Sequence, residues 1–222
     1  MPVTLIDCSR GFRCARTVLL AQALVAASAC APRLRPLSGA PAPARLPLAA
    51  LPAVHRRVVF QWELQDGEFT ARGEGVARIA PPDSARLDFF LGGGMSGGAA
   101  VLVADTLRAP GGDMVRRLIP PPAMLWAALG RLAVPALPDT SVRVDGPFLR
   151  ADIGAPASWR LTFRADSLLR VDRVSGGRIA EWIERDGPRV RYRNEGSRRS
   201  LSLTVTRVDE TPPFDASIWS LR

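Results

Sequence analysis

Apolar and polar residues alternate with a period of two through most of this chain from residue 56 onward. In the first such stretch, Phe60, Trp62 and Leu64 alternate with Gln61 and Glu63. Successive side chains of a β-strand point to opposite faces of the sheet. The pattern therefore predicts a strand with one apolar face and one polar face.

The same alternation returns in both halves of the chain, and glycine-containing turn signals separate the stretches. Strands that recur at intervals of about 8–12 residues, each with one wet face, are typical of an antiparallel sheet in a sandwich or barrel. An apolar face must curl onto itself or be covered. Further strands are expected around residues 69–79, 87–91, 101–103, 159–163, 169–171, 179–183, 190–192 and 201–205.

An apolar segment at residues 118–132 interrupts the strands. Pro122 is compatible with the first turn of a helix, and Leu125 and Leu129 then fall on one face. Gly130 weakens or ends that helix. A helix this short and apolar is unstable alone in water, so we expect it to close the mouth of the sheet.

Residues 134–140 contain two prolines and are expected to form a second, irregular plug. The predicted fold class is mainly β (α+β). It is a single curved antiparallel sheet that forms an incomplete β-barrel with a short helical plug.

The first 30 residues have the features of an export signal. Arg10, Arg13 and Arg16 precede an apolar run from Val18 to Ala29, and small residues lead up to Cys30. The run is shorter than the roughly 20 residues that cross a bilayer. A cysteine at this place resembles a bacterial lipoprotein signal. The resemblance implies cleavage before Cys30 and acylation of its thiol and new amine, by chains such as palmitate.

Two alternatives to this interpretation are a signal without lipid and an ordinary cysteine. With the lipoprotein signal, residues 1–29 are a signal peptide and residues 30–54 are a lipidated cysteine with a Pro/Ala-rich tether. Residues 55–222 are then the folded domain. Cys8 and Cys14 are removed with the signal, which leaves no cysteine for a disulfide or a metal.

The charge of the chain is strongly basic, and all 30 basic residues are arginine. The signal contributes three arginines and one aspartate, so a net charge of +9 falls to +7 after cleavage. A basic surface can contact anionic lipid head groups. We expect no nucleic-acid partner for an exported domain, and arginines solvated on strand faces are the simplest alternative.

Two sequence patterns match known catalytic or cofactor-binding motifs, but the residues around them do not fit either role. Residues 94–98 match G-x-S-x-G around Ser96, but that motif needs a helix after the serine, and a strand is expected here. The one histidine, His55, precedes the serine. Residues 92–97 also match G-x-G-x-x-G without the βα units of a dinucleotide fold. We therefore expect no enzyme activity, no cofactor and no metal.

An apolar cavity is the remaining candidate site, with ordinary core packing as the alternative for each residue. Ala71, Gly73, Gly75 and Ala77 leave one inner strand nearly bare, which gives room for a ligand or for close packing of the plug. The cavity candidates are Phe60, Trp62, Phe89, Met124, Leu125, Trp126, Leu129, Trp159, Leu161 and Phe163.

Residues Met124–Pro135 form an apolar helix that ends in Leu-Gly with a proline a few residues later. This segment, the order of strands, plug and strands, and the closing residues 190–192 and 199–208 resemble the LolA/LolB group of lipoprotein-localisation carriers and their relatives. The resemblance covers about residues 55–220. It implies an incomplete barrel whose helices close an apolar cavity for acyl chains.

The resemblance also implies a location and a role. We expect a monomeric lipoprotein of the bacterial outer membrane that faces the periplasm and is held in the membrane through Cys30. Ala31, which follows Cys30, is consistent with outer-membrane sorting. The domain would bind lipid or lipoprotein acyl chains and exchange them with a lipoprotein or periplasmic carrier. Leu91 and Met95 are the candidates for a transfer loop. The alternative from another class is an envelope assembly or scaffold protein with a solid core.

Overall fold

The computed structural model describes residues 32–92, 96–110 and 113–220. Arg33–Arg222 form one compact unit. The expected signal, Cys30 and Met95 lie outside the described residues. No described helix combines the length and the apolar character needed to span a bilayer.

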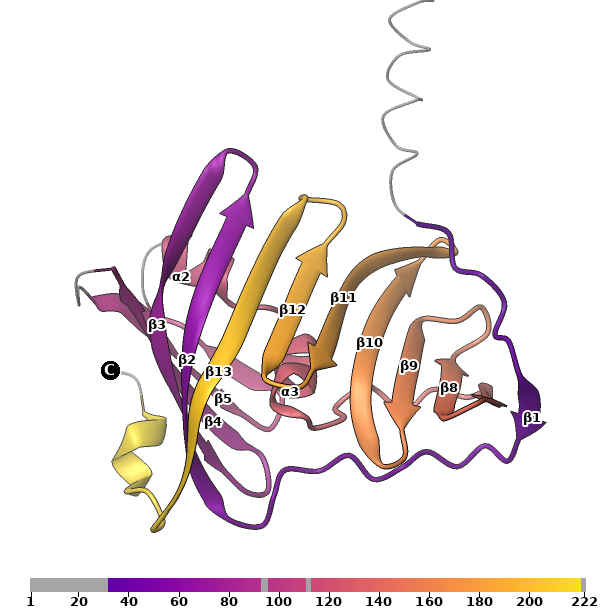
Figure 1. Ribbon diagram of the computed structural model, residues 1–222, viewed down its shortest axis with the longest axis horizontal. Helices are drawn as coiled ribbons and strands as arrows, with labels where there is room; N and C mark the ends of the chain where they lie inside the picture. The colour runs from indigo at the N-terminus through magenta and orange to yellow at the C-terminus, as the bar shows by residue number, and fades with distance from the viewer. Residues whose placement is uncertain (1–31, 93–95, 111–112, 221–222) are drawn as a thin grey trace, which may run out of the picture. The chain divides into compact units, whose positions relative to one another are not determined.

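One antiparallel sheet of thirteen strands makes up most of this unit (Figure 1). The strand order is β1-β7-β8-β9-β10-β11-β12-β13-β2-β3-β4-β5-β6. Within the described residues β1 and β6 stand at opposite ends of this order, and the sheet does not close. The expected mainly β fold, an open antiparallel sheet with a short helical plug, is confirmed.

Most strands begin and end where the alternating pattern does. The three longest strands, β13, β2 and β3, are neighbours in the sheet. The strands are β1 (Ala40–Ala42), β2 (His55–Asp66), β3 (Phe69–Ala80), β4 (Ser84–Leu91), β5 (Ser96–Val103), β6 (Thr106–Arg108), β7 (Thr140–Asp145), β8 (Phe148–Ile153), β9 (Trp159–Arg164), β10 (Ser167–Ser175), β11 (Arg178–Asp186), β12 (Arg189–Asn194) and β13 (Arg199–Thr211).

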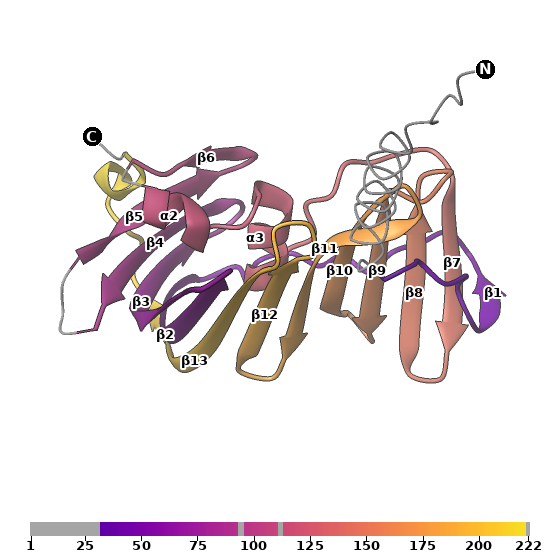
Figure 2. The same ribbon diagram turned by 90° about the horizontal axis from the view of Figure 1, so that it is seen from above.

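In the described residues three short helices accompany the sheet: α2 (Asp113–Leu118), α3 (Pro122–Leu129) and η2 (Ala216–Trp219). Figures 1 and 2 show α2 and α3 on the same face of the sheet. We call this the inner face. Helix α3 packs against β10, β11 and β12, and α2 packs against β5.

The plug helix α3 is shorter than the apolar segment that predicts it. Pro122 occupies its first turn, as expected, and Gly130 ends it in the left-handed region with φ of 92°. Glycine adopts this conformation without the clash that a Cβ causes. The backbone N–H of Gly130 donates to the carbonyl of Ala127, and that of Arg131 donates to Trp126. The residues that follow, 131–139, have no regular structure, as expected. Residues 135–139 are exposed, however, so this segment does not form the second plug that the sequence predicts.

The core lies between the inner face and these covering segments. Each long strand contributes buried side chains to the core, together with most of α3. A β-bulge between Leu168 and Arg170 changes the expected alternation in β10. As a result Leu168 joins Val171 in the core, where the sequence pattern favours Leu169.

The small residues of strand β3 are covered by aromatic side chains of the neighbouring strand β2. A Cβ added to Gly75 would lie 2.3 Å from the Phe60 ring, and one added to Gly73 would lie 2.8 Å from the Trp62 ring. Phe89 makes edge contacts with both rings, with centroids 5.8 Å and 6.1 Å apart. The two glycines therefore give β2 room for large aromatic side chains.

The Pro/Ala-rich segment contacts the sheet from its first described residues. Arg33 forms a β-bridge with Arg178, and β1 pairs with β7. Ala49 and Leu51 are buried in the core, and the carbonyl of Ala49 accepts a hydrogen bond from Leu132. From Arg33 onward the segment thus forms part of the packed unit.

Candidate functional site

The space directly beneath α3 is filled. Side chains from α3, β4, β11, β12 and β13 enclose about 10 Å³ of free volume. That is about the least space that holds one water molecule. The inner face is therefore a packed core under the helix, as close packing in protein interiors requires.

Most of the predicted cavity residues belong to this core. Leu129 and Trp159 are partly buried at its margin. Leu91, a predicted transfer-loop residue, ends β4 and packs against the core, while its partner Met95 is not described. The fully buried candidates are Phe60, Trp62, Phe89, Met124, Leu125, Trp126, Leu161 and Phe163.

An open cleft of about 700 Å³ lies beside α3. This volume is within the range of small-molecule sites, about 300–1,000 Å³. Its walls come from the start of α3, the irregular segment after α3, the β5–β6 turn and the inner face of β9, β10 and β11. Trp159, Ala133 and Val134 line it and also pack against the core, so the cleft is continuous with the apolar interior.

The floor of the cleft contains a buried carboxylate. Glu181 on β11 is 1% exposed and lies on the inner face opposite Arg173, with which it forms an ion pair. The hydroxyl of Tyr192 donates to Glu181 at 2.6 Å, and Arg199 donates to that hydroxyl at 3.3 Å. Burial raises the pKa of Tyr192, and so does its hydrogen bond to Glu181. The Glu181 charge is thus neutralised and its oxygens are satisfied.

A second arginine, Arg131, lies at the rim of the cleft and, unlike Arg173, is not paired with a carboxylate of the described residues. The Arg131 guanidinium lies 4.7 Å from the centroid of the Trp126 ring, at the distance of a cation–π contact. Its Nη1 is buried and has no hydrogen-bond partner. In the described part of the chain no carboxylate forms an ion pair with it. Trp126 itself is fixed by its indole N–H, which donates to the carbonyl of Ala104 at 2.7 Å.

Helix α3 begins at the same cleft. Pro121, Pro122 and Ala123 line the wall. No side chain caps the helix and its first turn has no acidic residue. The positive end of the helix dipole is therefore not compensated by a side chain there.

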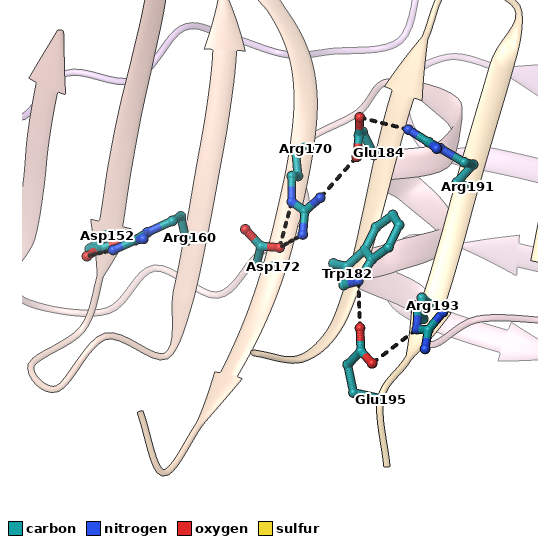
Figure 3. Close-up of polar contacts among 9 residues, drawn as sticks. All are labelled: Asp152, Arg160, Arg170, Asp172, Trp182, Glu184, Arg191, Arg193 and Glu195. Atoms are coloured by element: carbon teal, nitrogen blue, oxygen red, sulfur yellow. Dashed lines mark hydrogen bonds and ion pairs between the residues drawn. The ribbon is translucent and has the colours of Figure 1, made fainter. Parts of the chain in front are cut away.

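Carboxylates of the outer face form a network of ion pairs with arginines (Figure 3). Arg170 donates to Asp172 and to Glu184, and Arg191 donates to Glu184. Arg160 binds Asp152 through two hydrogen bonds of 2.7 Å and 2.8 Å. Each of these carboxylates is held by arginine, so the network is suited to joining strands β8–β12.

The same network extends through an aromatic side chain. The Arg170 guanidinium lies 4.4 Å from the centroid of the Trp182 ring. The Trp182 indole N–H donates to Glu195 at 3.0 Å, and Arg193 also donates to Glu195. Figure 3 shows these side chains lying across neighbouring strands.

In the described residues, the catalytic motif around Ser96 lacks the surroundings that a nucleophile needs. Ser96 begins strand β5, where a nucleophile elbow needs a helix. His55 Nδ1 accepts a hydrogen bond from the Phe214 backbone. Among the described residues no three His, Cys, Asp or Glu side chains are grouped so that they could hold a metal ion.

Sequence reasoning identified Trp159 but missed most of the cleft. Arg131, Asp105 and Ala123 carry no signal of their own, since they meet only when the β5–β6 turn and the segment around α3 fold over the sheet. Arg131 was visible only as the residue after the helix-ending glycine. The long-range arrangement, and not any local motif, creates this site.

No protein-family model matches the chain, and no curated protein does. Among solved structures, the chain is similar to a LolA superfamily protein from Nitrosomonas europaea, with 9% identity over 78% of this chain and 93% of that one and a TM-score of 0.49. A DUF1329 family protein from Desulfovibrio piger is 10% identical over 76% and 90%, with a TM-score of 0.48.

An outer membrane lipoprotein-sorting protein domain from Vibrio parahaemolyticus is 8% identical over 76% of this chain and 90% of its own, with a TM-score of 0.49. The group named by the sequence resemblance thus returns among the similar solved structures. At identities of 8–10% the likeness is one of fold alone.

Proposed function

We propose that this chain is an envelope lipoprotein that binds lipid or lipoprotein acyl chains non-covalently on the inner face of its sheet. The observation that carries the proposal is the open cleft of about 700 Å³ beside α3, with apolar walls continuous with the core. Burial of apolar surface is the driving force, at roughly 0.8 kcal/mol for each methylene group removed from water. The proposal involves no chemical step.

Helix α3 is the element that would adapt to a longer chain. All five residues from Met124 to Ala128 are buried, so displacing α3 exposes apolar surface that an acyl chain can cover. The helix is held by one indole hydrogen bond and by packing. An acyl chain that enters the cleft can extend beneath α3 only if the helix shifts, because about 10 Å³ is free there.

The proposed location follows from the signal. Cleavage before Cys30 and acylation of that residue would anchor a monomeric domain in the outer membrane, facing the periplasm, where a lipoprotein or a periplasmic carrier supplies or receives the acyl chain. The basic charge of the cleaved domain, +7 after the signal is removed from a chain of +9, suits a surface with anionic lipids.

A scaffold with a solid core is the second candidate, and the filled space beneath α3 favours it. The two candidates differ in what the cleft does. A carrier takes up an acyl ligand through the cleft, whereas a scaffold leaves the cleft empty and uses its surface to bind another protein.

Native mass spectrometry of the full chain with Cys30→Ala distinguishes them, because this variant has no anchor lipid of its own. We expect a non-covalent adduct of lipid mass after exposure to hexadecanoate. Ala123→Trp places a large ring in the cleft wall and should abolish the adduct. Ala50→Trp, at an exposed position outside the cleft, is the matched control and should keep it. Absence of any adduct in the parent chain would favour the scaffold.

A further inference from the structure

We infer that the cleft selects amphiphiles with an anionic head, and that Arg131 is the residue that recognises the head group. The inference rests on the proposed function and adds the charge class of the ligand to it. The head would be a carboxylate or a phosphate on a single alkyl chain, with the chain lying along the apolar wall toward Trp159.

The charges in the cleft single out Arg131. Of the four charged residues that line it, Arg173 and Glu181 neutralise each other as an ion pair. Arg131 and Asp105 remain, and no ion pair joins either of them to another described residue. Asp105 lies in the β5–β6 turn and is exposed to water, while Arg131 is half-buried against Trp126. A half-buried cation without a counter-ion is the group that gains most from an anionic ligand.

The guanidinium is suited to that role. It presents several N–H donors in one plane, which match the two oxygens of a carboxylate or phosphate. The Trp126 ring fixes one face of the group, and the indole hydrogen bond to Ala104 fixes the ring.

The apolar part of the ligand has its own wall. Ala133, Val134 and Trp159 lie in the same cleft as Arg131 and belong to the margin of the core. The site therefore combines one cation and one apolar surface, which is the pattern that a single-chain anionic amphiphile complements. A free small anion would find the cation but not the apolar wall.

The test compares two ligands of equal chain length, hexadecanoate and 1-hexadecanol, by displacement of an uncharged fluorescent alkyl probe from the full chain with Cys30→Ala. We expect the carboxylate to bind about tenfold more tightly than the alcohol. Arg131→Gln should reduce the ratio of the two affinities to about one. Thermal unfolding of the variant shows separately whether it is folded.

Asp105→Asn should change the preference for hexadecanoate in the opposite direction to Arg131→Gln. Because Asp105 repels an anion in the cleft, its removal should widen the preference for hexadecanoate. Arg189→Gln and Asp166→Asn, exposed residues that do not line the cleft, make the same changes of net charge and should leave the preference unaltered.

The outcomes separate this inference from the proposed function. Equal binding of acid and alcohol, or a preference that survives Arg131→Gln, would overturn the head-group assignment and leave acyl binding intact. Displacement by acetate or inorganic phosphate alone would overturn it as well, because the site would then be one for free anions. If neither long-chain ligand displaces the probe, the proposed function itself is wrong.

Discussion

Two buried carboxylates, one on each face of the sheet, show how the chain accommodates charge. Glu181 on the inner face is 1% exposed and Asp172 on the outer face is 3% exposed. Each is paired with an arginine on its own face, Arg173 and Arg170 respectively. A buried carboxylate without such a partner would be strongly destabilising. Arginines on both faces of the sheet thus neutralise the carboxylates that are buried there.

Asp172 gives a prediction about pH. Burial raises its pKa above the ordinary 3.8, against the opposing effects of its hydrogen bond to Arg170 and the charges of Arg170 and Arg160. A raised pKa means that the folded state binds the proton more tightly than the unfolded chain. The stability that Asp172 contributes is therefore complete below pH 3.8 and is lost as pH rises through the folded-state pKa.

Urea unfolding of the parent chain and of Asp172→Asn at a series of pH values measures this contribution. We expect the stability of the parent relative to the variant to fall as pH rises above 3.8 and then to become constant. The remaining titrating groups are common to both proteins, so the difference reports on Asp172. A relative stability that instead rises with pH would mean that the arginines outweigh burial.

At the scale of elements, strand β3 sets the spacing of the left part of the sheet in Figure 1. Gly73 faces Leu91 of β4 and Trp62 of β2 across the two ladders. A Cβ at this position would lie 1.9 Å from the backbone oxygen of Phe90. Because the clashing atom belongs to the backbone of the next strand, β3 and β4 would have to move apart.

Gly73→Ala is therefore expected to destabilise the protein by about 1–3 kcal/mol, the usual cost of overpacking. Gly92→Ala is the matched control, because a Cβ there has no heavy atom within 4 Å and its stability should change by less than about 0.5 kcal/mol. Thermal unfolding of the two variants compares them. Equal stabilities would show that β3 has the spare room that a ligand could use.

The strands differ in how well local sequence predicts them. Those with long alternation, such as β2 and β13, follow from the pattern alone. Strands β7 and β8 are short and were missed, although Val142 and Val144 alternate before the Asp145-Gly146 turn. Strand β1 contains Pro41 and exists because it pairs with β7 at the edge of the sheet, where proline is tolerated. No local signal could indicate that pairing.

At the scale of the whole unit, the sequence predicts the sheet and its plug but not the site. The sheet follows from a period that every strand repeats. The cleft depends on how far the β5–β6 turn and residues 131–135 lie from β9–β11, and such distances are set by tertiary packing. The Pro/Ala-rich segment is the other example, because its composition predicts an extended chain while Ala49 and Leu51 bind it to the core.

The central claim is that an acyl chain lies in the cleft beside α3, and quenching of tryptophan fluorescence by a brominated hexadecanoate tests it most directly. Trp159 lines the cleft, whereas Trp219 lies in η2 against Phe214. We expect the probe to quench the full chain with Cys30→Ala, Trp159→Phe to reduce the quenching, and Trp219→Phe to retain it. Saturating probe that leaves the fluorescence unchanged, or quenching that Trp159→Phe does not reduce, would contradict the account.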